Sequence, residues 1–493
     1  MRDPAIREMI AAFQASSPPA DGAEVALQLI AGLDLSQTQY DAREFIGLPQ
    51  AAFVARAYAA CFGIAPPPAI FFACRDRLLA GTISQAGLLR EFAASGRGIR
   101  VSGLRRQALR EMWAGSIPSA LALAAARTAR NILRLPRNLR RKRGGGQATA
   151  PVPKSAPRKP RIAILTVSSQ EEGGAERFYA GLEEALTRAG MGPERVAVEC
   201  REGSYADIVR SYRRCFDLDL SGYDGVISSK APSYAVRHPN HVCYLMHTMR
   251  AWYDMFEASH PFASRRTHDQ RRRIQALDTA ALQNLRRLAI GAEVAGRLRA
   301  YNGLDAGVVR PPSTLAGLHE GGFTHLFAPG RLHPWKRVDL AIAAMRFVKS
   351  PLRLVIAGTG QEEARLRAQA KSDPRIVFAG RVTEGELTDL YADAAAVLFL
   401  PRQEDLGFIT LEAFAAGKPV ITCTDSGEPA RLVRQDESGF ICPPDPRAIA
   451  ERIDFLAGDP SHAAAMGRAG RDSVADISWQ RVAEKLVAAL GYA

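Results

Sequence analysis

The spacing of hydrophobic residues changes near residue 160. Before it, apolar residues recur every three or four positions, as in "AAFVARAYAACFGI" (51–64) and "AGLLREFAASG" (86–96), which predicts amphipathic helices. After it, short runs rich in strand formers, beginning with "RIAILTV" (161–167), alternate with longer amphipathic stretches. The pattern predicts a helical region followed by strand–loop–helix units.

The strand-like runs form two series separated by Pro311 and Pro312. The first continues at 195–200, 225–229, 241–247 and 286–291, and the second occupies 325–330, 353–360, 376–380, 396–401 and 419–423. We therefore predict an α/β protein with two Rossmann-like domains that face a cleft, where ligands of such sheets bind. The expected segments are a small all-α accessory domain (1–133), a disordered basic linker (134–160), an acceptor-side domain (161–312), a nucleotide-sugar-binding domain (313–476) and a C-terminal helix (477–493) that can pack back on the acceptor-side domain.

Composition is that of an ordinary globular protein, with 47% hydrophobic and 24% charged residues. No run approaches the roughly 18 apolar residues of a membrane span, and the first residues are not signal-like, which favours a cytoplasmic location. The seven cysteines include no CxxC pair and have apolar or helix-forming neighbours, so we expect buried free thiols.

The formal charge of +14 is concentrated in one stretch. Residues 134–161 carry ten Lys or Arg and no Asp or Glu, among many Gly and Pro. This composition is typical of a disordered tether. It could also contact an anionic membrane surface, at roughly 1 kcal/mol per basic residue. The run lacks interleaved aromatic residues, so a nucleic-acid partner is not expected.

Two carboxylates in "EDLGFITLEAFAAG" stand at a predicted junction between a loop and a helix. Glu404 follows a strand-like run, and Glu412 lies inside the helix that Gly417 closes. A helix N-terminus suits a phosphate, and a carboxylate slightly deeper can accept hydrogen bonds from a ribose diol. Alternatively, Glu412 neutralises the helix dipole and Glu404 is a solvated loop acid.

Two cations follow a neighbouring strand-like run in "FAPGRLHPWK". Arg331 and Lys336 could converge on a diphosphate, the arginine as a fork and the lysine as a point charge. Surface cations after a strand are also common without function. Their combination with Glu404 and Glu412 favours a site.

Several segments in this order resemble the nucleotide-sugar half of retaining glycosyltransferases of the two-Rossmann-domain (GT-B) type, the family 4-like group with an E-x7-E motif. They are "GRLHPWK", "RLVIAGTGQEEARL", the stretch 376–421 and "SGEPARLV", with "GGAERF" (173–178) similar to the first glycine loop of the other half. The resemblance covers about residues 160–490. It implies that Arg331 and Lys336 hold the donor diphosphate, Glu404 the transferred sugar and Glu412 the ribose, with further donor contacts from Gly173, Gly174, Gly330, Gly407 and Phe408.

A second resemblance concerns "YLMHTMRAWYD" (244–254) and "EDLGF", which are similar to segments of bacterial O-antigen and exopolysaccharide mannosyltransferases. It implies that His247 lies beside the donor sugar and that GDP-mannose is the donor. Met249 stands where that group often has Pro, and "IGAEVAGRL" (290–298) lacks its usual Ser-Arg. Both departures weaken the mannose assignment more than the family assignment.

Two other motifs are expected to have no catalytic role. "DLDL" (217–220) contains a D-x-D but lies in the acceptor-side half, so we assign it to a loop or cap and expect no essential metal. "GTGQEE" (358–363) lacks the G-x-G-x-x-G pattern and sits in the second half, so no NAD or other cofactor is expected.

The sequence therefore predicts a hexosyltransferase that acts on a glycan or polyprenyl-linked acceptor in surface polysaccharide synthesis, peripherally attached to the inner membrane face. Residues 53–96 also resemble a helical domain of unknown function from bacterial surface-polysaccharide proteins, which implies an unidentified protein partner. Three alternatives remain open: a non-catalytic scaffold of a polysaccharide assembly complex, a UDP-sugar transferase, and an epimerase or hydrolase on the same fold.

Overall fold

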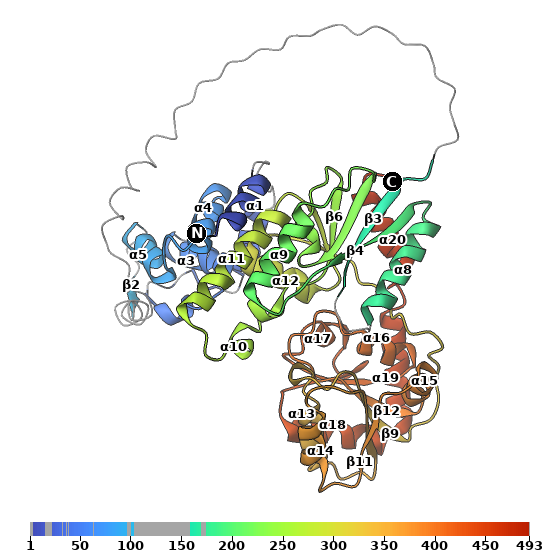
Figure 1. Ribbon diagram of the computed structural model, residues 1–493. Helices are drawn as coiled ribbons and strands as arrows, with labels where there is room; N and C mark the ends of the chain where they lie inside the picture. Colours follow the sequence, from blue (N-terminus) through green and yellow to red (C-terminus); the bar gives the residue numbers. More distant parts are fainter. Residues whose placement is uncertain are drawn as a thin grey trace, which may run out of the picture.

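The computed structural model describes residues 3–14, 22–31, 33–35, 37, 39–62, 64–95, 100–102, 158–168 and 174–492. Most of the basic linker and Gly173 lie outside the described residues. Two α/β domains and a smaller helical module make up the described chain (Figure 1). Three clusters of buried apolar side chains form its cores.

The first α/β domain is built on a parallel six-stranded sheet with the order β4-β3-β5-β6-β7-β8. Its strands are β3 (Arg161–Ser168), β4 (Gly192–Glu199), β5 (Gly225–Lys230), β6 (His241–His247), β7 (Arg286–Ala289) and β8 (Gly307–Val308). Its helices are α8 (Gly174–Arg188), α9 (Tyr205–Phe216), α10 (Phe256–Ser259), α11 (Arg265–Leu282) and α12 (Ala292–Asn302). The strand order reverses between β3 and β5, and Lys230 ends β5 at this point.

The second α/β domain has the parallel order β11-β10-β9-β12-β13-β14, so its strand order reverses between β9 and β12. Its strands are β9 (His325–Pro329), β10 (Arg353–Ala357), β11 (Ile376–Gly380), β12 (Ala394–Leu398), β13 (Val420–Cys423) and β14 (Gly439–Cys442). Its helices are α13 (Val338–Met345), α14 (Glu363–Ala370), α15 (Glu384–Ala392), α16 (Phe408–Ala415), α17 (Glu428–Leu432), α18 (Pro446–Gly458) and α19 (Pro460–Ser473). Ligands of such sheets bind beyond the strand ends at the reversal.

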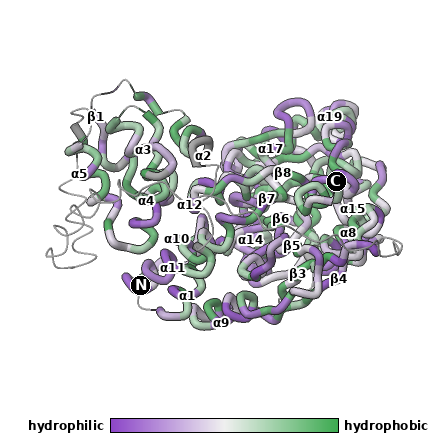
Figure 2. The backbone as a smooth tube through the Cα atoms, turned by 90° about the horizontal axis from the view of Figure 1, so that it is seen from above, coloured by the Kyte–Doolittle hydropathy of each residue, from purple (hydrophilic) through white to green (hydrophobic). Residues whose placement is uncertain are grey.

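The helical module packs beside the first α/β domain, with α11 and α12 between them (Figure 2). It contains α2 (Gly22–Leu29), α3 (Gln50–Phe62), α4 (Pro68–Leu79), α5 (Gln85–Ser95), β1 (Gln39–Asp41) and β2 (Arg100–Ser102). Phe71 packs against Gly303 at the C-terminus of α12, and the buried Arg75 donates a 2.7 Å hydrogen bond to the Asn302 carbonyl. The module is therefore fixed to one end of α12.

The two ends of the described chain both pack on the first α/β domain. Helix α1 (Pro4–Gln14) contacts α9 and α11, and its Ile6 and Met9 belong to that domain's core. Helix α20 (Trp479–Ala489) contacts α8, where the Trp479 ring lies so close to Gly181 that a Cβ there would clash at 2.4 Å. The chain thus crosses between the two α/β domains twice, after β8 and before α20.

The predicted fold class is confirmed in its two facing Rossmann-like domains and its preceding helical region. All strands expected from the apolar runs are present, within a few residues of their predicted limits. The pair β1–β2 and the strands β8 and β14 were not expected, because runs of two to four residues carry no periodicity. Helix α1 also departs from the expectation, since it joins the first α/β core and not the helical module. All seven cysteines are free and buried, as predicted.

Candidate active site

The reversal point of the second sheet carries a cation and a carboxylate in contact. Lys336 ends a short 3₁₀ helix (Pro334–Lys336) beyond β9, and Glu404 lies in the loop beyond β12. The Lys336 Nζ atom is 2.8 Å from Glu404 Oε2, and their side chains are 21% and 19% exposed. The ammonium also lies 5.4 Å from the Phe399 ring centroid. The pair is therefore accessible to a ligand at the edge where such sheets bind nucleotides.

The residues beside this pair adopt an uncommon backbone conformation. Arg337 and Gln403 have φ values of 50° and 49°, in the left-handed region. Such residues cost about 1–3 kcal/mol each and cluster at functional sites. Arg337 offsets the cost, because its guanidinium binds Asp425 at 2.6 Å and donates to the Leu400 and Pro401 carbonyls at 2.7 Å. This arginine fixes the end of β12 next to the loop that presents Glu404.

Glu412 occupies a more enclosed position in α16. Its Oε2 accepts a 2.6 Å hydrogen bond from the Tyr391 hydroxyl of α15, and burial raises the pKa of its carboxyl above the usual range. Glu404 and Glu412 therefore have different partners in this structure. The helix begins at Phe408 after Gly407, whose φ is 77°, and a Cβ at this position would lie 2.7 Å from the Pro429 ring, so both features favour a glycine.

The glycines of "GTGQEE" have a packing role. A Cβ at Gly358 would lie 2.0 Å from the Gly330 carbonyl oxygen, and one at Gly360 would lie 2.4 Å from that of Leu332. Gly330 itself has a φ of 127°. The loop after β10 thus lies against the backbone of the loop that carries Arg331. This close packing of two loops requires a residue without a side chain at both Gly358 and Gly360.

His247 ends β6 on the opposite side of the cleft. Its Nδ1 lies 3.0 Å from the Thr248 carbonyl, so we assign the ring proton to Nδ1, which leaves Nε2 as an acceptor. Burial lowers the pKa of His247, although Asp405 opposes this shift from across the cleft. The imidazole is therefore neutral at pH 7. Lys230 is paired with it in the strand register, and burial lowers the pKa of its ammonium.

A buried arginine joins the two domains beside His247. Arg297 of α12, only 2% exposed, forms an ion pair with Asp254 at 2.9 Å and another with Asp405. It also donates a 3.1 Å hydrogen bond to the Gln403 carbonyl. The loop that presents Glu404 to Lys336 is thus held from the first domain.

A second arginine holds the same loop. Arg250 pairs with Asp254 at 2.9 Å and donates to the Arg402 carbonyl at 2.9 Å. Its guanidinium lies 5.0 Å from the Trp335 ring centroid, a cation–π distance. The segment 244–254 therefore contacts both loops of the second domain that carry the Lys336–Glu404 pair.

The N-terminus of α12 explains one departure from the resembled pattern. Glu428, fully buried, accepts a 2.8 Å hydrogen bond from the Glu293 amide and a 2.7 Å bond from Arg310 Nε. Gly291 lies so close that a Cβ would stand 2.6 Å from the Asp405 carbonyl oxygen. There is no room for the serine that commonly occupies this turn, and a carboxylate from the other domain caps the helix in its place.

The first glycine loop is described only from Gly174, the first residue of α8. Arg177, one turn later, forms a 2.7 Å ion pair with Glu384 at the start of α15 in the second domain.

The two aspartates of the D-x-D segment make local contacts: Asp217 pairs with Arg213 at 2.6 Å, and Asp219 accepts a hydrogen bond from the Ser221 amide. Among the described residues, no cluster of His, Cys, Asp and Glu could hold a metal ion. No helix in that part of the chain is long and apolar enough to cross a membrane.

The comparisons with known proteins agree with this geometry. Residues 318–473 match the family model "Glycosyl transferases group 1", which places a glycosyltransferase domain on the second α/β unit. Solved structures match with low identity: sucrose-phosphate synthase from Thermosynechococcus elongatus (TM-score 0.55, 18% identity, 66% of this chain and 97% of that one) and WaaG, a glycosyltransferase involved in lipopolysaccharide biosynthesis (TM-score 0.53, 15% identity, 66% and 98%). These likenesses support the GT-B fold.

Curated relatives align over part of the chain. They include glycogen synthase of Mycobacterium tuberculosis, 32% identical over 37% of this chain and 45% of its own. A GDP-mannose-dependent phosphatidylinositol monomannoside mannosyltransferase of Corynebacterium glutamicum is 34% identical over 32% of this chain and 44% of its own. Human alpha-1,3/1,6-mannosyltransferase is 31% identical over 29% and 34%. The chain thus spans less than half the length of each of these relatives.

Sequence reasoning missed the residues that join the domains. Other residues were singled out in the segments that contain Arg250, Arg297, Asp405 and Glu428. The only sequence signal available was a position next to a predicted site residue, as for Asp405, which follows Glu404. Its partner lies more than 100 positions away, so only the folded chain identifies the pair.

Proposed function

We propose that this protein is a retaining hexosyltransferase that transfers a sugar from a nucleotide diphosphate sugar to a hydroxyl group of a glycan or lipid-linked acceptor. The observation that carries the proposal is the Lys336–Glu404 pair at the reversal point of a Rossmann-like sheet. Across the cleft, His247 is close enough to the adjacent Asp405 for that carboxylate to affect its pKa. The family match of residues 318–473 supports the same reaction class.

The chemistry breaks the bond between the anomeric carbon and a phosphate oxygen and forms a bond from that carbon to the acceptor oxygen. Negative charge develops on the leaving diphosphate. Lys336, together with Arg331, stabilises this charge, and such electrostatic stabilisation contributes most of the rate enhancement in many enzymes. Because Lys336 is already held by Glu404, its ammonium is oriented before the donor enters.

Glu404, Glu412 and His247 act on hydroxyl groups of the donor. Glu404 binds the transferred sugar, and His247 offers a neutral Nε2 to a sugar hydroxyl. Glu412 binds the ribose, because a carboxylate has about four acceptor sites and Tyr391 occupies one of them. The proton of the acceptor hydroxyl passes to an oxygen of the leaving diphosphate as the new glycosidic bond forms.

Mannose from GDP-mannose is the proposed donor sugar. Two relatives named as mannosyltransferases support it, one of them GDP-mannose-dependent by name. A UDP-sugar is the competing donor, since glycogen synthase is also a relative and a structural neighbour, HepE of Anabaena, was solved with UDP and glucose (TM-score 0.51, 15% identity, 68% of this chain and 100% of that one).

The test is a panel of GDP- and UDP-sugars incubated with the full chain, with nucleoside diphosphate release measured. Release from one donor that is lost in Lys336→Ala establishes the activity and names the sugar. Donor binding is measured in parallel by calorimetry. If no donor on the panel binds, the transferase proposal is wrong and the scaffold alternative gains support.

The basic linker is proposed to attach the enzyme to an anionic membrane surface, where lipid-linked acceptors would be found. Its composition supports this, and residues 134–157 lie outside the described part of the chain. Flotation with anionic liposomes is compared for the full chain and a variant without residues 134–160. Equal flotation would leave the segment as a tether only.

A further inference from the structure

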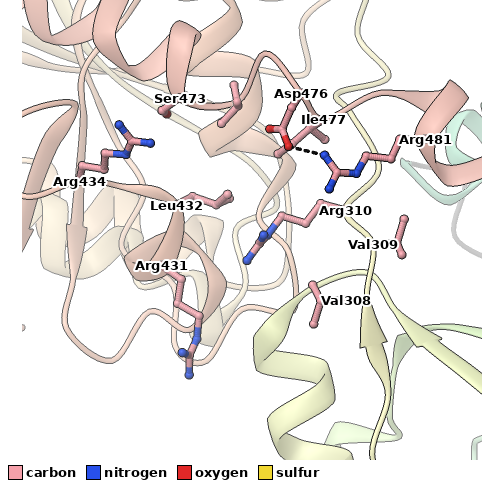
Figure 3. Close-up of a pocket in the computed structure, with 11 residues that line it drawn as sticks. Val308, Val309, Arg310, Arg431, Leu432, Arg434, Ser473, Asp476, Ile477 and Arg481 are labelled. Atoms are coloured by element: carbon pink, nitrogen blue, oxygen red, sulfur yellow. Dashed lines mark hydrogen bonds and ion pairs between the residues drawn. The ribbon is translucent and has the colours of Figure 1, made fainter. Parts of the chain in front are cut away.

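A cavity of about 210 Å³ lies at the junction of the two α/β domains, away from the Lys336–Glu404 pair. Its walls come from three places: Val308 to Arg310 in the first chain crossing, Ser473 to Arg481 in the second, and Arg431 to Arg434 at the end of α17 (Figure 3). Both connections between the domains therefore line one cavity.

Four arginines line this cavity, against a single acidic residue. They are Arg310, Arg431, Arg434 and Arg481, and the acid is Asp476. Figure 3 shows Arg481 paired with Asp476 on one side, Arg434 on the opposite side and Arg310 between them. Each arginine has a carboxylate partner (Glu428, Glu293, Glu437 and Asp476, in that order), but of these acids only Asp476 lines the cavity, so the lining itself carries an excess of positive charge.

Three of the arginines are available to a ligand. Arg431, Arg434 and Arg481 are 54–56% exposed, and their partners Glu293, Glu437 and Asp476 lie at 3.7, 2.9 and 2.6 Å. Exposed ion pairs of this kind are weak and readily exchanged. Arg310 differs, because it is held by the buried Glu428 at 2.5 Å. It supplies a fixed positive charge in the wall.

The size and charge of the cavity specify the ligand class. Guanidinium groups bind phosphate oxygens in a bidentate fork, which adds geometry to charge. A water molecule takes about 30 Å³ of liquid, so the space corresponds to roughly seven waters, enough for a phosphate group and a few further atoms.

We propose that this junction cavity binds a phosphate dianion, either free phosphate or a small phosphomonoester, at a site separate from the donor cleft. This inference goes beyond the proposed function and does not depend on it. Arg434 and Arg481 bind the oxygens from the second domain and the second crossing, and Arg310 contributes from the first crossing.

Helix α17 connects the proposed anion site to the contact between the two domains at α12. One end of this helix carries Glu428, which caps α12 and binds Arg310, and the other end carries Arg431 and Leu432 in the cavity wall. An anion in the cavity lies beside the Arg310 guanidinium, which Glu428 holds in place. The ligand therefore favours particular relative positions of the two domains.

The experiment is calorimetric titration of the full chain with inorganic phosphate and, separately, glycerol 3-phosphate, at constant ionic strength in chloride. We expect saturable binding of at least one of the two. The double variant Arg434→Gln/Arg481→Gln should weaken it about tenfold or more, as for loss of a charged hydrogen bond. The matched control is Arg188→Gln, an exposed arginine paired with Glu184 at 2.6 Å on α8, which does not line the cavity.

A second arm separates this site from the donor site. In Lys336→Ala, phosphate binding should persist, because Lys336 does not line the cavity. Phosphate binding with unchanged affinity in the double variant, or its loss in Lys336→Ala, would overturn the proposal. So would the absence of saturable binding by either anion. Melting curves confirm that each variant is folded.

Discussion

Glu404 and Asp405 are adjacent, yet their side chains serve different domains. Glu404 pairs with Lys336 of its own domain in a site open to ligand, whereas Asp405 pairs with the buried Arg297 of the other domain. The first pair is about one-fifth exposed on each side, and Arg297 is 2% exposed. One loop therefore both presents an accessible carboxylate and joins the domains.

The accessible Lys336–Glu404 pair and the buried Arg297–Asp405 pair illustrate two different uses of an ion pair. An accessible pair can exchange its partner for a ligand phosphate at small cost, so it suits chemistry. A buried arginine cannot lose its carboxylates without a large penalty, so it suits a fixed connection. Mutations on the two sides should therefore differ in what they impair: stability on one side, turnover on the other.

The largest effect is expected for Arg297→Met. The substitution leaves Asp254 and Asp405 without their buried cation, which typically costs about 3–5 kcal/mol of stability. Denaturant unfolding measures this. The control is Arg299→Met on the same helix, whose arginine is 23% exposed and pairs locally with Asp305. Equal losses in both variants would contradict the distinction between buried and accessible pairs.

The next effect concerns turnover. Lys336→Ala should lower the rate of transfer about 100-fold or more, equivalent to about 2.7 kcal/mol, because a charge-stabilising donor is lost. Stability should change little. Initial rates with the donor found by the panel measure the effect, with Lys349→Ala, an exposed lysine of the same domain, as the control. Near wild-type rates would remove Lys336 from the diphosphate site.

A pH experiment tests the stability of the first sheet without touching the cleft. Burial lowers the pKa of His241 to about 3, and its Nε2 lies 2.7 Å from Ser228 Oγ. The unfolded chain, with a pKa of about 6.5, binds the proton more strongly, so stability falls as the pH drops from about 6.5 toward 3. His241→Gln should reduce the loss between pH 7 and pH 5 by about 2 kcal/mol.

Unfolding at the two pH values measures this loss. His325→Gln in the second sheet is the comparison: its ring has partners on both sides, Thr324 Oγ1 at 2.9 Å and the Leu390 carbonyl at 3.1 Å. His325 is also buried, but its hydrogen bond to the Leu390 carbonyl and the nearby Asp393 oppose the lowering of its pKa, so a smaller change is expected. If His241→Gln keeps the wild-type pH dependence, another group causes the acid sensitivity.

Glu412→Ala is expected to weaken donor binding while turnover at saturating donor changes less. Loss of a carboxylate that accepts hydrogen bonds from the ribose hydroxyls should raise the donor Kd roughly tenfold, about 1.5 kcal/mol. Calorimetry with the nucleoside diphosphate measures it. Tyr391→Phe is the control, because it removes the 2.6 Å hydrogen bond to Glu412 but keeps the carboxylate. An unchanged Kd in Glu412→Ala would exclude this residue from the ribose site.

The smallest effect is expected at the exposed pair between the domains. Arg177 and Glu384 are 38% and 70% exposed and lie 2.7 Å apart. Arg177→Gln should cost no more than about 1 kcal/mol of stability, and the difference should shrink in high salt. A loss as large as that of Arg297→Met would show that exposure does not set the strength of these connections.

The sequence predicted the two sheets well because their strands are continuous apolar runs, such as β6 and β12, with every residue or nearly every residue buried. It also brought Lys336 and Glu404 to one edge, because parallel strands end on the same side of a sheet. The position of Glu412 inside its helix left a ribose contact and dipole neutralisation as alternatives, the resemblance assigned it to the ribose, and its bond to Tyr391 could not be foreseen from spacing.

The connections between domains were not predictable in the same way. Arg297 lies 108 positions from Asp405, and Glu428 lies 135 positions from Glu293. No local pattern identifies such partners, because an arginine on a helix is usually solvated. Short elements such as β8 and the Arg337 turn also could not be predicted, since their conformation is imposed by tertiary contacts and not by propensity.

Helix α12 has one further consequence for the molecule as a whole. Its N-terminus rests on Glu428 of the second domain, and its C-terminus rests on Phe71 and Arg75 of the helical module. With 11 residues it is about 16 Å long, a stiff rod held at both ends. The helical module and the second α/β domain are thus joined by one rigid element, and a force applied to either is transmitted to the other.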